Sequence, residues 1–179
     1  MELPDNELIR RIKGGDSNSF ATLVERYKKP IFNLMYRYSN SVDDAADMTQ
    51  DIFCRVFEKL DLYREQRKFF SWLYTLALNY ARDWRKKQYA YERNTGDLNL
   101  NEPTDNNPTE NETESKQQVE KLMLALETLP DDRKEMVILR YRHERSIREL
   151  AEIFDLSESA VKMRLHRSLG DLGQKLNGL

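Results

Sequence analysis

The chain has 179 residues, a hydrophobic fraction of 39%, and a formal net charge of −2 at pH 7. It is long enough for one large or two small domains, and it has neither an apolar stretch of bilayer length nor a signal peptide, so no membrane insertion is expected. One cysteine, Cys54, and two histidines cannot form an internal disulfide or a Cys/His metal cluster. We therefore expect a cytoplasmic protein without a metal or cofactor.

Acidic residues are concentrated in the middle of the chain. Residues 94–118 carry 1 basic and 6 acidic side chains, whereas residues 1–93 carry 17 and 14 and residues 119–179 carry 11 and 11. The middle segment is rich in Asn, Thr, Glu and Pro and has too few apolar residues to bury a core, which predicts a flexible acidic linker. Two domains are thus expected, at 1–93 and 119–179, and neither has a net charge that would repel DNA.

The first domain has helical periodicity throughout. Apolar side chains recur at i, i+3, i+4 and i+7 from Phe20 and again from Ile31, and Pro30 between them is expected to mark a break or a new start. Further helices are predicted at 43–60 and 69–91, with a polar loop at 61–68. No stretch alternates with a period of two for long enough to suggest a sheet. The predicted fold class is all-α, with two small helical domains.

The helix at 43–60 is expected to be acidic on one face. Its predicted inward stripe is Ala45, Met48, Thr49, Ile52, Phe53, Val56 and Phe57, and the carboxylates of Asp43, Asp44, Asp47, Asp51 and Glu58 lie opposite. They could serve solubility or dock a basic protein surface. Asp43-Asp44-x-x-Asp47 also fits the D-D-x-x-D magnesium motif of isoprenoid synthases. That fold needs a deep pocket and a second acidic motif, which a 93-residue domain does not provide.

The helix at 69–91 is expected to be basic on its exposed side. Its predicted buried stripe is Trp72, Leu73, Leu76, Tyr80 and Trp84, and the outward residues are Leu78, Arg82, Arg85, Lys86 and Tyr89. Cations interleaved with an aromatic residue at 82–87 suit single-stranded nucleic acid. An ordinary solvated face has the same composition, so both interpretations remain open on this helix alone.

The second domain contains a predicted helix-turn-helix at 146–169. An amphipathic helix with Val119, Leu122, Met123, Leu126 and Leu129 ends at Pro130, and a second helix follows at 132–143. Ser146 and Glu149 form an S-x-x-E capping box for a third helix. After a turn in which Leu156 is expected to be buried, Ser157 caps a fourth helix that runs to about residue 176.

The fourth helix is the candidate recognition helix. At 100° per residue its buried stripe is Val161, Leu165, Leu169 and Leu172. The opposite face carries Ser159, Met163, His166 and Arg167, with Lys162 and Arg164 on its shoulders. Short polar groups and cations facing outward suit the major groove, although a surface helix of a small bundle can carry the same residues.

Three motifs occur in order along the chain. Residues 43–53 match an Asp-Ala-x-Asp-Leu-Thr-Gln-Asp-Val-Phe type helix, residues 69–79 match a Phe-x-x-Trp-Leu-Tyr-x-x-Ala-x-Asn block, and residues 129–134 match Leu-Pro-x-x-x-Arg/Lys before the helix-turn-helix. In this order, and divided by an acidic linker, they resemble the extracytoplasmic-function group of bacterial sigma factors.

The resemblance implies a role for each set of residues and no catalytic activity. The clamp of RNA polymerase would be bound by Asp43, Asp44, Asp47, Gln50 and Asp51, and its β flap is a further expected contact. The single-stranded −10 element of the promoter would be bound by Tyr63, Arg64, Arg67, Lys68, Asn79, Arg82, Arg85 and Lys86, and the loop 63–68 would capture an unstacked base of that element. The duplex −35 element would be read by Ser159, Lys162, Met163, Arg164, His166 and Arg167. Leu78 departs from an Arg that is frequent in the family, and Met163 from a small polar residue.

The leading hypothesis is therefore a sigma factor that directs transcription initiation and is silenced by an anti-sigma protein. The alternative is a conventional helix-turn-helix regulator whose first domain senses a ligand. Such a regulator would bind duplex DNA tightly without polymerase and would usually dimerise, yet no heptad seam or ligand-pocket motif is visible.

Overall fold

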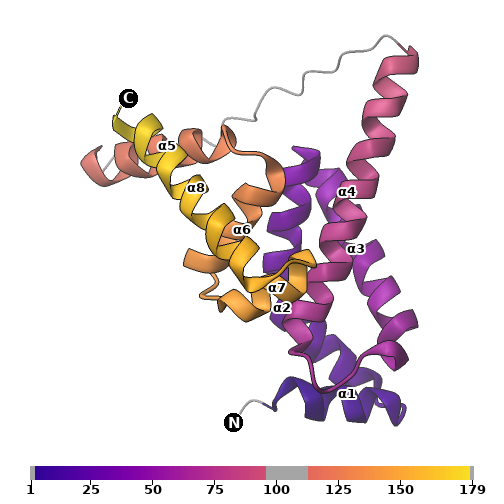
Figure 1. Cartoon of the computed structure of the whole chain (residues 1–179). Coiled ribbons are helices and arrows are strands. Elements are labelled where there is room, and N and C mark those ends of the chain that lie inside the picture. Colours follow the sequence, from indigo (N-terminus) through magenta and orange to yellow (C-terminus); the bar gives the residue numbers. More distant parts are fainter. Residues whose placement is uncertain (1–2, 96–112, 178–179) are drawn as a thin grey trace. The chain divides into compact units, whose positions relative to one another are not determined.

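The computed structural model describes residues 3–95 and 113–177, and these two ranges contain helices and no strand. The all-α prediction is confirmed. The chain divides into two compact units between residues 104 and 105. Figure 1 shows the helices of the first unit in indigo to magenta and those of the second in orange to yellow.

The first unit consists of α1 (Asp5–Lys13), α2 (Ser17–Ser39), α3 (Val42–Lys59), the 3-10 helix η1 (Leu60–Leu62) and α4 (Phe69–Thr95). Local signals begin the longer helices: the Asp16 carboxylate accepts from the amide nitrogens of Asn18 and Ser19, and the Ser41 hydroxyl accepts from that of Asp44. α2 packs against α1, α3 and α4. The core between them includes Leu23, Ile31, Leu34, Ile52, Leu73 and Tyr74.

The prediction that Pro30 interrupts the chain is wrong, because α2 continues through it without a break. Proline removes one backbone donor and usually kinks a helix. Here three residues of the next turn, Ile31, Leu34 and Met35, are fully buried. Packing of these residues offsets the free-energy cost of a proline inside the helix. The local sequence pattern does not reveal this packing.

α4 is buried over a wider arc than its sequence pattern predicts. Leu78, expected to face outward, is 0% exposed, whereas Trp72, Leu76, Tyr80 and Trp84 are only half-buried. α2 and α3 both pack on α4, so two faces of this helix are covered instead of one. Leu78, which departs from the family pattern, therefore lies in the core of the first unit.

The second unit consists of α5 (Thr113–Glu127), α6 (Asp131–Tyr141), α7 (Ile147–Phe154) and α8 (Glu158–Asn177), with α8 packed against the other three. The predicted linker at 94–118 falls largely on residues 96–112, which lie outside the described residues. At its two ends, residues 94–95 complete α4 and residues 113–118 begin α5. Glu, Lys and Gln in that first stretch of α5 are good helix formers.

The apolar stripe predicted for α5 is only partly buried. Leu126 and Leu129 lie in the core, but Val119, Leu122 and Met123 are exposed. Within residues 118–127 of α5, the part whose burial is described, the buried residues are Ala125 and Leu126 in its last turn.

Candidate nucleic-acid and partner interfaces

The helix-turn-helix is built by two caps and a left-handed turn. Ser146 and Glu149 form the predicted capping box, with the Glu149 carboxylate accepting from the Ser146 amide nitrogen at 2.9 Å. Asp155 ends α7 in the left-handed region at φ 54°. Ser157 then accepts from the Ala160 amide nitrogen at 3.2 Å and begins α8. Leu156 is half-buried, so the turn is less enclosed than expected.

The outward face of α8 carries most of the predicted −35 residues. Val161, Leu165 and Leu172 are buried, as expected, and Ser168 joins them. The exposed residues opposite are Ser159, Lys162, Met163, His166 and Arg167, while Arg164 is half-buried at the edge. The prediction that Leu169 is buried is wrong, because its side chain is 44% exposed. The neighbouring residue Ser168 is buried instead, so the buried stripe of α8 runs through position 168 and not through position 169.

A contact from α6 fixes α8 in place. Arg133 donates to the Ser168 hydroxyl at 3.0 Å and to the Asp171 carboxylate at 2.7 Å. Ser168 in turn donates to the Arg164 carbonyl oxygen at 2.8 Å. Sequence periodicity does not assign this role to Arg133, since its partners are more than thirty residues away.

The cations on the basic side of α4 differ in whether they are exposed or bonded to other parts of the first unit. Asn79 and Lys86 are exposed, and Arg82 donates to the Asn79 side-chain oxygen at 3.2 Å. Arg85, in contrast, donates to the backbone carbonyl oxygens of Arg37 and Tyr38 at 3.2 and 3.0 Å. Its guanidinium also lies 4.6 Å from the centre of the Tyr38 ring. This guanidinium joins α4 to the end of α2.

The loop 63–68 presents its charged residues outward and its aromatic residue inward. Arg64 and Lys68 are exposed and Arg67 is half-buried. Tyr63, expected with them at the DNA, is only 4% exposed, and its ring meets those of Phe69 and Trp72 with centroids 5.5 Å apart in each pair. Its burial raises the pKa of the Tyr63 hydroxyl, with the carboxylates of Asp5 and Glu65 adding to the shift. Tyr63 thus supports the loop from beneath.

The acidic residues of α3 lie on its surface as predicted from the helical pattern. The exposed set is Asp43, Asp44, Asp47, Gln50 and Asp51. Asp51 accepts a hydrogen bond of 2.7 Å from the Tyr80 hydroxyl of α4. Burial and this hydrogen bond raise the pKa of Tyr80 to about 12. Asp51 is therefore held in a fixed position, while the other carboxylates extend into solvent.

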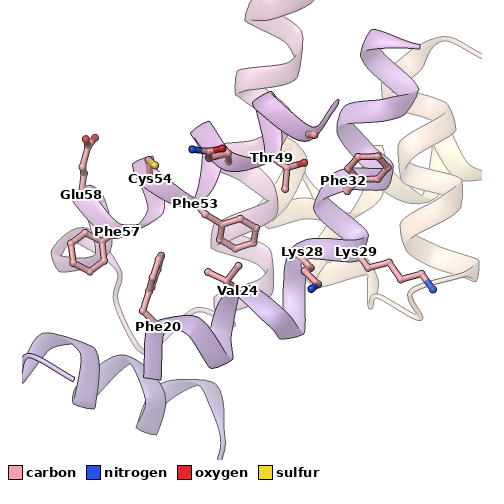
Figure 2. A pocket seen from close by; sticks show the side chains of 12 residues that line it. Phe20, Val24, Lys28, Lys29, Phe32, Thr49, Phe53, Cys54, Phe57 and Glu58 are labelled. Atoms are coloured by element: carbon pink, nitrogen blue, oxygen red, sulfur yellow. The ribbon is translucent and has the colours of Figure 1, made fainter. Parts of the chain in front are cut away.

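An apolar groove of about 1030 Å³ runs between α2 and α3. Figure 2 shows the rings of Phe20, Phe53 and Phe57 between the two helices, with Lys28 and Lys29 on the α2 side. Phe57 was expected in the core but is 56% exposed and makes an edge contact with Phe20 at 5.1 Å.

The groove was not predicted from the sequence, although a signal exists. Phe20, Val24, Lys28 and Phe32 line it and are four residues apart, which places them along one side of α2. The stripe predicted from Phe20 includes Phe20 and Val24 together with Leu23, but only Leu23 of these three is buried, and half-buried Phe20 and Val24 line the groove with Phe32. Cys54 lies at the groove and is exposed.

The described part of the chain contains no candidate metal site. Within residues 3–95 and 113–177, no three His, Cys, Asp or Glu side chains are grouped so that they could hold a metal ion, and this includes Asp43, Asp44 and Asp47. No helix of these same ranges has the length and apolar character needed to cross a bilayer.

The fold defines a two-unit helical protein whose second unit contains a helix-turn-helix. Residues 23–90 match the family model of Sigma-70 region 2, and residues 119–172 match that of Sigma-70, region 4. The chain is 31% identical to the ECF RNA polymerase sigma factor SigW of Bacillus subtilis (strain 168) over 100% of both chains. It belongs to the extracytoplasmic-function family of RNA polymerase sigma factors.

Two solved structures share the fold. CnrH, in complex with the cytosolic domain of CnrY, superposes with a TM-score of 0.72 at 21% identity, and the match covers 97% of each chain. The sigma factor RpoE of Bartonella quintana, in complex with the anti-sigma factor NepR, gives a TM-score of 0.68 at 20% identity over 88% of this chain and 96% of that one.

Proposed function

We propose that this protein binds core RNA polymerase in the cytoplasm, reads the two promoter elements with its two units and so directs transcription initiation, without performing chemistry itself. The observation that carries the proposal is the outward face of α8 on a chain that matches sigma factors along its whole length. A face of this kind reads duplex DNA, and the family membership supplies the polymerase as partner.

The −35 element is assigned to α8. Lys162 and Arg167 are exposed cations that can reach phosphates or base edges, and a bidentate contact of Arg with guanine would contribute about 1–3 kcal/mol of discrimination. Met163 is 50% exposed on the same face, where an apolar side chain suits the methyl group of thymine.

The −10 element is assigned to the loop 63–68 and to α4. Arg64 and Lys68 on the loop, and Asn79, Arg82 and Lys86 on the helix, remain the proposed DNA contacts, with Arg67 at the loop's half-buried edge. Tyr63 and Arg85 are assigned a supporting role, because both are engaged inside the unit. Opening the duplex costs roughly 1.4 kcal/mol of stacking per step, which contacts to the unpaired strand partly recover.

The polymerase is assigned to α3 and the groove beside it. Exposed carboxylates at Asp43, Asp44 and Asp47 would attract a basic helix, and Gln50 lies both on this surface and at the groove. An apolar centre with a charged rim is the usual composition of a protein interface. The β flap is proposed as a second contact of the polymerase, with the second unit.

An anti-sigma protein is proposed as the inhibitor of this factor. The Bartonella relative is found with such a protein, and the exposed faces of both units offer surface for one. Purification of the protein from its native host should recover a stoichiometric partner. A free and constitutively active protein would argue against this regulation.

Run-off transcription with core polymerase tests the proposed function. Wild-type protein should yield promoter-dependent product, whereas Lys162→Ala and Arg167→Ala should each reduce it about 5- to 150-fold, the range of one lost contact of about 1–3 kcal/mol. Lys175→Ala is the matched control, because it removes an exposed cation from the last turn of the same helix.

Two results would contradict the proposal or favour the alternative. If no promoter yields product with core polymerase, the proposal is wrong. Tight and specific duplex binding by the protein alone would then favour a conventional regulator.

A further inference from the structure

The first helix is tied to the loop 63–68 by two side-chain links. The guanidinium of Arg10 forms a fork on Glu65, with its Nε and Nη2 at 3.1 and 3.2 Å from the two carboxylate oxygens. The Tyr63 hydroxyl lies 2.9 Å from Oδ1 of Asn6 and 2.6 Å from the Arg67 carbonyl oxygen. Both links connect positions more than fifty residues apart in the sequence.

α1 is itself held rigidly on α2. The Asp5 carboxylate bonds the side chains of Arg26 and Tyr27, and Arg26 also donates to the Leu3 carbonyl oxygen at 2.8 Å. Leu8 and Ile9 are buried in the core of the unit. The loop is therefore linked to a helix that is itself packed on α2 and hydrogen-bonded to it.

The fork of Arg10 on Glu65 determines geometry more than stability. Their hydrogen bond and mutual charge raise the pKa of Arg10 and lower that of Glu65. Both side chains are exposed, and an exposed pair contributes little to the free energy of unfolding. A bidentate Arg–carboxylate pair nevertheless restrains the orientation of both groups, so Glu65 fixes the middle of the loop.

These links hold the loop at two positions. Buried Tyr63 and exposed Glu65 both bond to α1, and the exposed residues Arg64, Gln66 and Lys68 alternate with them along the loop. A loop that must distinguish one unpaired base from another needs its backbone fixed before binding, because ordering on binding weakens affinity and loosens the site.

We propose that Asn6 and Arg10 are positioning residues for promoter recognition: without touching DNA, they hold the loop 63–68 in the shape that selects the unpaired base. The inference rests on the proposed function of this loop and deepens it, since it assigns part of the −10 specificity to the first helix of the chain.

The test uses the full chain assembled with core polymerase and a randomised pool of single-stranded DNA. Enrichment by holoenzyme over core polymerase gives a discrimination ratio for the preferred base. Asn6→Ala and Arg10→Ala should each lower that ratio about 2- to 10-fold, the effect of one lost hydrogen bond. Arg11→Ala is the matched control, because Arg11 pairs with Glu7 on the same helix and does not reach the loop.

Exchanging the charges of Arg10 and Glu65 distinguishes a positioning role from a general loss of stability. Arg10→Glu and Glu65→Arg should each lower the ratio, and the double variant should restore it, while binding of duplex −35 DNA and the thermal midpoint stay unchanged in all three. Ratios equal to wild type in Asn6→Ala and Arg10→Ala would overturn the inference. So would a double variant that is no better than the single ones.

Loop variants separate failure of this inference from failure of the proposed function. If Arg64→Ala and Lys68→Ala reduce enrichment but the α1 variants do not, only the positioning role is wrong. If the loop variants have no effect, or wild-type holoenzyme enriches nothing beyond core polymerase, the −10 assignment of the loop is wrong and the positioning role with it.

Discussion

Neighbouring cations on α4 have different roles although the sequence presents them alike. Arg85 bonds two backbone carbonyl oxygens and lies over a tyrosine ring, whereas Lys86 is exposed. Arg85→Ala should therefore lower the free energy of unfolding by about 1–3 kcal/mol. Lys86→Ala should change it by less than about 0.5 kcal/mol. Denaturant unfolding of the two variants measures this contrast, and equal losses would contradict it.

Tyr80 is the residue whose titration reports on the contact between α4 and α3. Burial and the bond to Asp51 raise its pKa to about 12, above an unfolded value of about 10. Because the folded pKa is the higher one, Tyr80 contributes stability that is complete below about pH 10 and is lost as pH rises toward 12.

The difference in unfolding free energy between wild type and Tyr80→Phe should thus be constant below about pH 10 and shrink above it. Asp51→Asn should move the midpoint of this change to lower pH, because one cause of the shift is removed. If the difference in unfolding free energy grew with rising pH, the pKa of Tyr80 would be lowered by folding and not raised, which would contradict the prediction.

At the scale of elements, two glycines should respond in opposite directions to the same substitution. Gly170 lies within α8 with open space around an added Cβ, so Gly170→Ala should raise the free energy of unfolding by about 0.5–1 kcal/mol. Gly15 joins α1 to α2 at φ +96°, where an L side chain is strained, so Gly15→Ala should lower it by about 1 kcal/mol. Thermal unfolding of both variants provides the check, and a shared sign would contradict the assigned backbone conformations.

Element boundaries show where local reasoning succeeds. The capping box at Ser146 and the cap at Ser157 were correctly predicted, because each depends on residues three positions apart. The break at Pro30 was wrong, because the helix there is maintained by buried neighbours in the next turn. A cap is a local interaction, whereas the tolerance of a proline depends on tertiary packing.

At the scale of the whole molecule, the net charge is −2, although exposed cations on α4 and α8 are proposed to bind one promoter at two places. Each phosphate contact releases counterions and adds about 0.9 to the slope of log K against log salt. Lys86→Ala in the first unit and Lys162→Ala in the second should each reduce the slope for holoenzyme on promoter DNA by about one, and the double variant by about two. Fluorescence anisotropy across a salt series measures these slopes, and a double variant no different from a single one would contradict a two-site grip.

The sequence by itself determined the fold class, the order of most helices and the family. These follow from periodicity, caps and motifs, which are local properties of the chain. It also located most of the exposed residues of α8, Leu169 excepted, because one helix face is buried and the opposite face follows from helical geometry. The same geometric rule failed for α4, because two other helices cover it. Leu78 was predicted to face outward, but it lies in the core because a second helix packs on its side of α4, and the sequence pattern of α4 does not reveal that helix.

Only the tertiary structure decided which of the predicted contact residues are occupied within the protein. Tyr63 and Arg85 have the chemistry of DNA ligands, but each is engaged with partners distant in sequence. The groove between α2 and α3 and the links from Asn6 and Arg10 to the loop are likewise made by segments that folding brings together. The helix-turn-helix could be predicted because its parts are adjacent in the chain, whereas the support of the −10 loop could not, because its two halves meet only in the folded bundle.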